Sequence, residues 1–185
     1  FNMESYTVVD LIFGEERGTE TLRGDTVKDF RIFSAGMLNS LDRFTGSGGN
    51  LFISGAYIGT DMVENSDSSA IHFAADVLHY IWRTNHATSI GTVVSTDQGR
   101  SVFPSKIAFN TDFGTGIYRV ESPDAIEPVG QDAFRICRYE SGSTSAGVAY
   151  KGAYKTVTLG FPFETIITEA DRNEVMKRVI EFLEE

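Results

Sequence analysis

The N-terminal half of the chain alternates twice between a strand-like run and an amphipathic run, and this order restricts the choice of fold more than any other feature. Residues 6–13 are β-branched or apolar almost throughout, which is typical of a strand buried on both faces. Residues 26–44 carry apolar side chains every three or four positions, which predicts a helix that Asp25 or Thr26 would cap. A strand at 50–54 and a helix at about 69–85 repeat the pattern. The β-α-β-α order with short connections predicts a parallel sheet with helices on both faces.

The sequence changes character after residue 90. Short β-prone runs are separated there by glycine, proline, asparagine and aspartate, and we interpret them as meandering strands, some extending the sheet and others forming a β-rich insertion. The runs are 93–94, 107–109, 117–120, 134–139, 148–150 and 156–159. A closing helix is predicted at about 168–184, because Thr168 and Asp171 form a capping pattern ahead of an apolar stripe. No repeat or linker divides the chain, so residues 1–185 are predicted to form one domain, which we expect to be a fragment of a larger protein.

The acidic composition restricts the classes of partner. The formal net charge is −10, and the chain has no run of lysine and arginine that could neutralise a nucleic-acid backbone or an anionic membrane. No apolar stretch approaches the ~20 residues that a membrane-spanning helix needs. The single cysteine, Cys137, excludes an internal disulfide bond, and its strand-like surroundings predict a buried structural thiol. We therefore expect neither nucleic-acid binding nor membrane insertion, and no cofactor or metal site is predicted.

A glycine-flanked turn follows the second predicted strand. That strand ends at Ser54, and Gly55 and Gly59 enclose Tyr57 ahead of the next helix. Such a turn can present its central residue beside backbone N–H groups, as in a nucleophile elbow. A phenol is a weak nucleophile at neutral pH unless its surroundings strongly acidify it. The turn is therefore interpreted first as a close-packed structural bend and second as a site.

Two segments together resemble the class I glutamine amidotransferase-like superfamily, which has a flavodoxin-like fold. In that family the elbow reads Gly-x-Cys-x-Gly and the last strand ends in His-x-Glu, which completes a Cys–His–Glu triad. Residues 55–59 match the elbow with Tyr57 in place of the cysteine, and residues 162–164 match the second motif with Pro162 in place of the histidine. Glu164 is kept, and the strand before Gly14 is similar to the one that precedes the family's oxyanion loop. The resemblance implies a triad that has lost both its thiol and its base.

The wording of the two segments, GGNLFISGAYIG and LGFPFETI, is similar to domains of large secreted Bacteroidetes proteins, some labelled xanthan lyase or amidase. The resemblance implies a flavodoxin-like three-layer α/β sandwich with a mostly parallel sheet, helices on both faces and a β-rich insertion. It also implies an extracellular or periplasmic location, with the cytoplasm left open. The partner it implies is a carbohydrate or a neighbouring domain of the same polypeptide.

Three functions remain open. The leading one is a non-catalytic, amidotransferase-like accessory or binding domain of an exported protein directed at polysaccharide or cell wall, because the elbow keeps its glycines but has neither thiol nor histidine. The second is a hydrolase or polysaccharide lyase that uses Tyr57 and Glu164 as acid and base. The third is a cytoplasmic regulatory subunit. The predicted site lies at the carboxyl edge of the sheet and comprises Gly14, Glu15, Ser54, Gly55, Tyr57, Gly59, Pro162 and Glu164.

Histidine, acidic and aromatic residues supply further candidates. His72, His79 and His86 recur every seven residues on the predicted second helix, too far apart for one metal ion, so a simple pair between His72 and Asp76 is favoured. The acidic loop residues are interpreted as a solvated rim rather than a cation site; they are Glu15, Glu16, Glu20, Asp61, Glu64 and Asp67. The aromatic residues are interpreted as buried rather than as a sugar-stacking platform; they are Trp82, Tyr118, Tyr139, Tyr150 and Tyr154.

Overall fold

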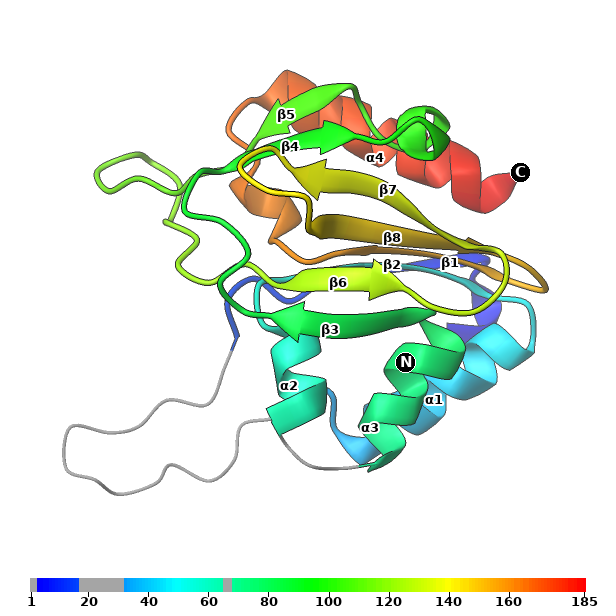
Figure 1. Ribbon diagram of the computed structural model, residues 1–185. Helices are drawn as coiled ribbons and strands as arrows, with labels where there is room; N and C mark the ends of the chain where they lie inside the picture. Colours follow the sequence, from blue (N-terminus) through cyan, green and yellow to red (C-terminus); the bar gives the residue numbers. More distant parts are fainter. Residues whose placement is uncertain (1–2, 17–31, 65–67) are drawn as a thin grey trace, which may run out of the picture.

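A curled, mixed sheet of seven strands forms the body of the molecule. The structure is a computed structural model that describes residues 3–16, 32–64 and 68–185 (Figure 1). The order across the sheet is β1 (Val8–Ile12), β2 (Asn50–Ser54), β9 (Lys155–Leu159), β8 (Ser145–Lys151), β7 (Ala133–Tyr139), β4 (Thr92–Ser95) and β5 (Lys106–Ala108). Segments from the beginning and the end of the chain therefore pair in this sheet.

One side of the sheet is parallel and the other is antiparallel. β1, β2 and β9 run parallel, whereas β8, β7, β4 and β5 continue the sheet in antiparallel pairs. The prediction of a flavodoxin-like, mostly parallel sandwich is therefore wrong. The reason is the length of the connections, because residues 140–144 join β7 to β8 and residues 152–154 join β8 to β9. Such loops are too short for the crossover that a parallel pair needs.

The segment 69–85 is not the single helix that its apolar spacing predicts. α3 (Ser68–His72) passes into a π-helical turn, η2 (Phe73–Val77), and the chain then forms strand β3 (Tyr80–Thr84). His79 has a φ of 57°, a left-handed conformation in which a right-handed helix cannot continue. β3 pairs with β6 (Ala125–Pro128) in a separate antiparallel sheet of two strands. The aromatic and β-branched residues of β3 favour a strand, and this preference prevails over the helical spacing.

The helices begin where side chains cap them. α1 (Ala35–Gly46) starts after Ser34, whose hydroxyl accepts a hydrogen bond from an amide of the first turn, and the predicted residues 26–31 lie outside the described chain. The predicted closing helix is confirmed as α4 (Glu169–Glu184), with Thr168 as its N-cap. A short helix, α2 (Ile58–Glu64), follows the glycine-flanked turn. Single 3-10 turns are η1 (Met3–Ser5), η3 (Gln98–Ser101) and η4 (Phe163–Thr165).

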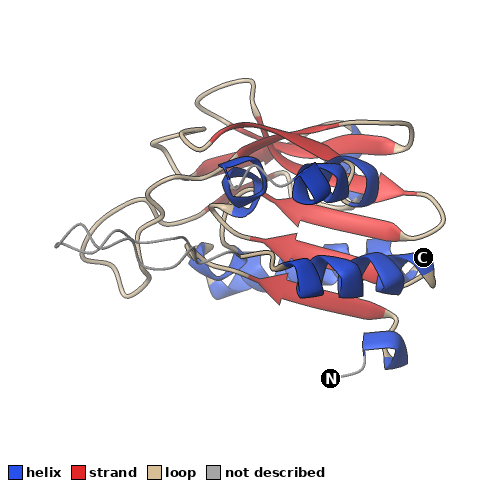
Figure 2. Cartoon of the chain, turned by 90° about the horizontal axis from the view of Figure 1, so that it is seen from below, coloured by secondary structure: helices blue, strands red, loops and turns tan. Residues whose placement is uncertain are grey.

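The core lies on both sides of the parallel strands. Figure 2 shows α1 in front of these strands and α4, fainter, behind them. Because both faces of β2 are covered, Leu51, Phe52 and Ile53 are each 0% exposed. Burial of side chains of this size contributes roughly 2 kcal/mol apiece to folding, so β2 is a central element of stability. None of the described helices is both long and apolar enough to cross a membrane.

Candidate functional site

The three parallel strands end at one edge of the sheet, where the loops that follow them are tied together. The Ala56 amide donates a hydrogen bond to the Gly14 carbonyl at 2.9 Å, and the Gly55 amide donates to the Leu159 carbonyl at 3.2 Å. Gly14 has a φ of 59°, and a Cβ at this position would lie 3.1 Å from Oε1 of Glu164. The loops that carry Gly14, Gly55 and Glu164 therefore meet at this edge.

Tyr57 lies at the centre of the turn between β2 and α2. Its side chain packs in the hydrophobic core, and 5% of the residue is exposed. Ser54 is also buried, and its hydroxyl accepts a hydrogen bond from the Phe163 amide at 3.4 Å. Pro162 is buried at the start of η4. None of these side chains is presented to solvent in the way that the nucleophile of an elbow must be.

A buried carboxylate closes the turn from within. Asp124 is 0% exposed, and its Oδ2 accepts hydrogen bonds from the amides of Gly59 at 2.7 Å and Thr60 at 3.1 Å. Its Oδ1 accepts from the Thr60 hydroxyl at 2.7 Å and from the indole N–H of Trp82 at 3.0 Å. Backbone N–H groups that follow an elbow residue are the usual ligands of an oxyanion. Here the amides of Gly59 and Thr60, in the first turn of α2, are occupied by the protein's own carboxylate.

The backbone of Asp124 is fixed as firmly as its side chain. Its amide donates to the Gly160 carbonyl at 2.7 Å, and its carbonyl accepts from the Tyr139 hydroxyl at 2.7 Å. The residue therefore joins the start of β6 to the end of β9 and to β7. Sequence reasoning missed this residue, since its only local signal is a Pro-Asp pair, Pro123 and Asp124, which is typical of an ordinary turn.

The stability of the protein is expected to decrease with rising pH because of Asp124. Burial raises the pKa of its carboxyl from 3.8 to about 7, although the hydrogen bonds from Thr60, Trp82 and Gly59 oppose the shift. Between these two pKa values the folded state binds more protons than the unfolded state, so the free energy of unfolding falls as pH rises from about 4 to about 7. One pKa unit corresponds to about 1.4 kcal/mol, which gives a loss of roughly 4 kcal/mol over this interval.

Urea unfolding at pH 4 to 8 measures this effect, with the Asp124→Asn variant as the reference for all other titrating groups. The difference between the two curves should slope downward with rising pH. Parallel curves would contradict the raised pKa.

Glu164, which matches the glutamate of the family's triad, binds Tyr118 rather than Tyr57. The Tyr118 hydroxyl donates a hydrogen bond to Oε1 of Glu164 at 2.5 Å. Desolvation and this hydrogen bond raise the pKa of Tyr118 well above its usual value. Oε2 of Glu164 is buried and has no hydrogen-bond partner within the described residues. The edge therefore pairs Glu164 with Tyr118, whereas Tyr57 packs in the core.

Two further carboxyl groups lie near this pair. Partial burial and the Glu164 carboxylate raise the pKa of Asp10, on β1, to about 6. Asp10 still has an exposed surface, so solvent screens the interaction and its contribution to stability is small. Glu15 lies in the loop after β1, and its Oε1 accepts a hydrogen bond from the Glu121 amide at 2.6 Å. Of these groups, Asp10 can hold and exchange a proton near neutral pH.

A buried asparagine shapes the loop that carries Tyr118. Asn110 is 2% exposed. Its side-chain NH2 group donates hydrogen bonds to the carbonyls of Asp112, Ile117 and Tyr118 at 2.9–3.1 Å. The predicted strand at 117–120 is therefore wrong, because the backbone in this region is bound to a side chain rather than to another strand. The loop holds Phe113 at its surface, 81% exposed, with the Arg119 guanidinium 4.4 Å from the ring centre.

The other predicted groups separate in the structure. His72 and Asp76 form an exposed ion pair at 3.7 Å, which confirms the simple pairing. His79 instead stacks on Tyr150 with ring centres 3.6 Å apart, beyond the end of η2. Cys137 is 0% exposed inside β7, as predicted, and burial raises the pKa of its thiol. Within the described ranges, no group of three or more acidic, histidine or cysteine side chains could hold a metal ion.

The acidic rim is partly engaged in structural contacts. The Asp61 carboxylate accepts hydrogen bonds from the amides of Ile32 and Phe33 at 3.2 and 3.3 Å, and so fixes the chain ahead of α1. Glu16 is exposed. Glu20, Asp67 and the side chain of Glu64 lie outside the described part of the structure. The aromatic residues divide in the same way, since Tyr139 is fully buried whereas Tyr118 is 43% exposed.

Comparisons with known proteins bear on the fold alone. No family model and no curated protein matches the chain. The structure is similar to the mmIFT52 N-terminal domain, with a TM-score of 0.51 and 13% identity over 83% of this chain and 72% of that one. It is also similar to the exo-beta-1,4-mannosidase Op5Man5 from Opitutaceae bacterium strain TAV5, with a TM-score of 0.46 and 11% identity, over 80% of this chain and 22% of the mannosidase.

The first likeness agrees with a strand-rich, curled mixed sheet and, together with the strand order, overturns the flavodoxin-like prediction. The predicted description as a secreted, xanthan lyase-like Bacteroidetes domain has no support from this likeness and is corrected with the fold. The likeness to the mmIFT52 N-terminal domain, at 13% identity, shows architecture rather than activity.

Proposed function

We propose that this chain is a non-catalytic binding or accessory module. The closed turn carries the proposal, because catalysis at an elbow needs an exposed nucleophile and free N–H donors beside it. Tyr57 packs in the core, and the amides of Gly59 and Thr60 already bind the Asp124 carboxylate. The turn therefore serves as a structural joint between β2, α2 and β6.

Features of the loop after β5 support a binding role. Phe113 exposes most of its ring on a backbone that Asn110 fixes at three carbonyl groups. A rigid, exposed aromatic residue loses little conformational entropy on contact and is typical of recognition surfaces. A carbohydrate ring or a neighbouring domain of the same polypeptide would suit such a surface.

The relationship to the amidotransferase-like superfamily stays a proposal. It is supported by the places of two segments, since the turn at Gly55 follows β2 and Glu164 follows the adjacent parallel strand β9. The changes at Tyr57 and Pro162 favour an inactive relative over an active one.

Hydrolysis assays test the proposed function. The substrates are glutamine and panels of esters, amides and glycosides. The purified chain and the Tyr57→Phe variant are both expected to release no product above background. Turnover by the native chain that Tyr57→Phe abolishes would contradict a non-catalytic role.

An acid–base enzyme is the second candidate, and one observation favours it. The 2.5 Å hydrogen bond between Tyr118 and Glu164 lies near Asp10, whose pKa is raised to about 6. A phenol and two carboxyl groups can transfer protons in a hydrolase or a polysaccharide lyase. In the same assays, activity lost in both Glu164→Gln and Tyr118→Phe but kept in Tyr57→Phe would establish this function.

A further inference from the structure

A polar cavity opens between the loop that follows β3 and the loop that leads to β6. Its volume is about 300 Å³, at the lower end of the range for small-molecule sites. Val120, which is 2% exposed, is its one apolar lining residue. The polar lining residues come from both loops and are His86, Thr88, Ser89, Thr111, Arg119 and Glu121. The cavity therefore presents mainly hydrogen-bonding groups to a ligand.

Hydrogen bonds fix the backbone on both sides of the cavity. In the first loop, the Ala87 amide donates to the Pro123 carbonyl at 3.2 Å. In the second, the Val120 amide donates to the carbonyl of Asn110, whose side chain already binds three carbonyls of the same loop. Because the walls are held in place by the protein itself, a ligand would not have to order them on binding.

Arg119 contributes hydrogen-bond donors that the protein does not use. The residue is half-buried, and its guanidinium lies 4.4 Å from the centre of the Phe113 ring. Two other half-buried arginines, Arg135 and Arg178, pair with carboxylates at 2.5 and 2.6 Å. Among the residues that the structure describes, no carboxylate or carbonyl accepts a hydrogen bond from the Arg119 guanidinium. Its five N–H donors are therefore available to a ligand in the cavity.

Phe113 adds an apolar surface next to these donors. The Arg119 guanidinium lies over one face of the ring, and 81% of the residue is exposed, so the rest of the ring is open to solvent. Arg119 lines the cavity and contacts Phe113, which places the ring and the cavity side by side. An aromatic ring beside polar groups suits a ligand that has both an apolar face and a polar edge.

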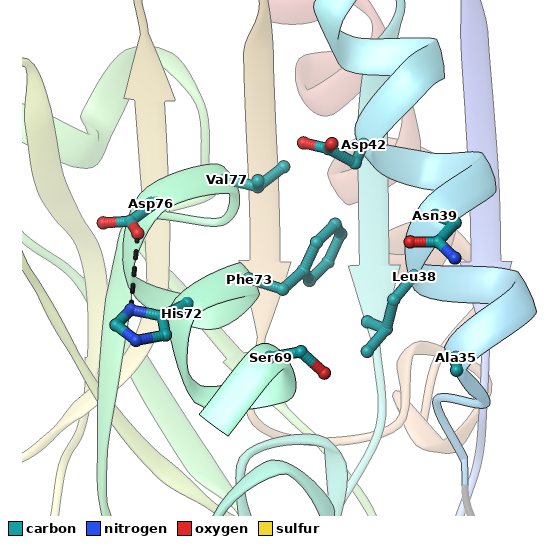
Figure 3. Close-up of a pocket in the computed structure, with 9 residues that line it drawn as sticks. All are labelled: Ala35, Leu38, Asn39, Asp42, Ser69, His72, Phe73, Asp76 and Val77. Carbon is teal, nitrogen blue, oxygen red and sulfur yellow. Dashed lines mark ion pairs between the residues drawn. The ribbon is translucent and has the colours of Figure 1, made fainter. Parts of the chain in front are cut away.

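The cavity between α1 and the segment of α3 and η2 has no such combination, although its volume is similar, about 310 Å³. Figure 3 shows the Asp76 carboxylate turned toward His72, its ion-pair partner at 3.7 Å, and away from Asp42. The aromatic residue of that cavity, Phe73, is only 5% exposed. An exposed ring and available donors thus occur together beside Arg119 and not between the helices.

We propose that the cavity beside Arg119, together with Phe113, binds a neutral oligosaccharide. Sugar hydroxyls donate and accept hydrogen bonds, and the cavity offers both functions, since Arg119 donates, Glu121 accepts and the serine and threonine hydroxyls do both. One arginine and one glutamate line it, so neither a strongly anionic nor a strongly cationic ligand is favoured. One sugar ring would occupy the cavity, and the next would place its C–H face on Phe113. The inference rests on the proposed binding function and names its ligand class.

A titration with defined sugars tests the inference. The ¹⁵N-labelled chain is titrated separately with cellotetraose, mannotetraose, laminaritetraose and xylotetraose, and with the anionic sugar trigalacturonate. At least one neutral tetrasaccharide is expected to give saturable amide shifts at millimolar concentration, confined to residues 86–89 and 111–121. Added salt should leave this affinity unchanged, because the ligand carries no charge. Tighter binding of trigalacturonate, or no saturable shift with any neutral sugar, would overturn the proposal.

Matched variants assign the binding to the ring and the guanidinium. Phe113→Ala and Arg119→Gln should each weaken the affinity at least about tenfold, whereas Phe113→Tyr, which keeps a ring, should stay within about twofold. Arg43→Gln makes the same charge change on the exposed face of α1 and should have no effect. Unchanged affinity in Phe113→Ala, or an equal loss in both arginine variants, would contradict the assignment. Cleavage of a bound sugar would instead refute the non-catalytic role, which a lack of sugar binding would leave in place.

Discussion

Replacement of Asp124 by alanine is expected to destabilise the protein by about 3–5 kcal/mol, because it leaves buried donors without an acceptor. The amides of Gly59 and Thr60 and the indole N–H of Trp82 would lose their acceptor in the interior. For a domain of this size the loss corresponds to a decrease in Tm of roughly 10 °C. Thermal and urea unfolding followed by circular dichroism at pH 7 measure it.

The matched control is Asp112→Ala, which removes a carboxylate from an exposed loop. Its unfolding free energy should stay within about 0.5 kcal/mol of the native value, as surface substitutions usually do. If Asp124→Ala were no less stable than this control, the Asp124 carboxylate would not stabilise the segment between β2 and α2.

Replacement of Gly160 by alanine is expected to cost about 2–4 kcal/mol, because the close approach between β9 and Asp124 leaves no room for a methyl group. A Cβ at this position would lie 2.2 Å from the Asp124 carbonyl oxygen, which is backbone and cannot rotate away. The strands would have to separate, and the 2.7 Å hydrogen bond from the Asp124 amide to the Gly160 carbonyl would lengthen. Urea unfolding measures the loss, and the near-ultraviolet signal of Trp82 should report the displaced contact.

Gly46→Ala provides the comparison for this variant. A Cβ at Gly46 would meet nothing within 4 Å, so the substitution should be neutral or slightly stabilising through the unfolded chain. An equal loss in both glycine variants would show that the close approach at Gly160 is not the cause.

The regular parts of the fold could be predicted from the sequence. The runs that form β1, β2 and β9 are rich in apolar or β-branched residues, as buried parallel strands often are, and Thr168 marks the start of α4. The antiparallel half of the sheet could not be predicted in the same way, because the short β-prone runs do not indicate which strand each one pairs with. The five-residue and three-residue connections around β8 would have required hairpins, since a parallel pair needs a longer crossover.

The second predicted helix failed for a different reason. Its apolar spacing is compatible with a helix as far as Val77, and α3 and η2 use that spacing. The left-handed backbone of His79 and the strand pairing of Tyr80–Thr84 depend on β6, which lies some forty residues further on. Local periodicity cannot register a partner strand so distant in the sequence.

The sequence indicated where the candidate site lies in the fold but not which side chains form its contacts. Glycines at positions 55 and 59 placed a tight turn after β2, and the order of the strands placed Glu164 near it. The closing carboxylate comes from Asp124, which is 64 residues from Thr60 in the sequence. The partner of Glu164 is Tyr118, held by Asn110 in a loop with no strand. A single polar residue in a turn gives no sign of the distant amides that it binds.

The internal closure of the turn has a consequence for any attempt to convert this scaffold into an enzyme. Exchange of Tyr57 for cysteine would place a thiol in the core, next to amides that remain neutralised by a resident anion. An incoming oxyanion would first have to displace that anion, and its removal by mutation weakens the joint on which α2 rests. Reactivity and folding are thus opposed at this position, so a return to catalysis requires several coordinated changes rather than one.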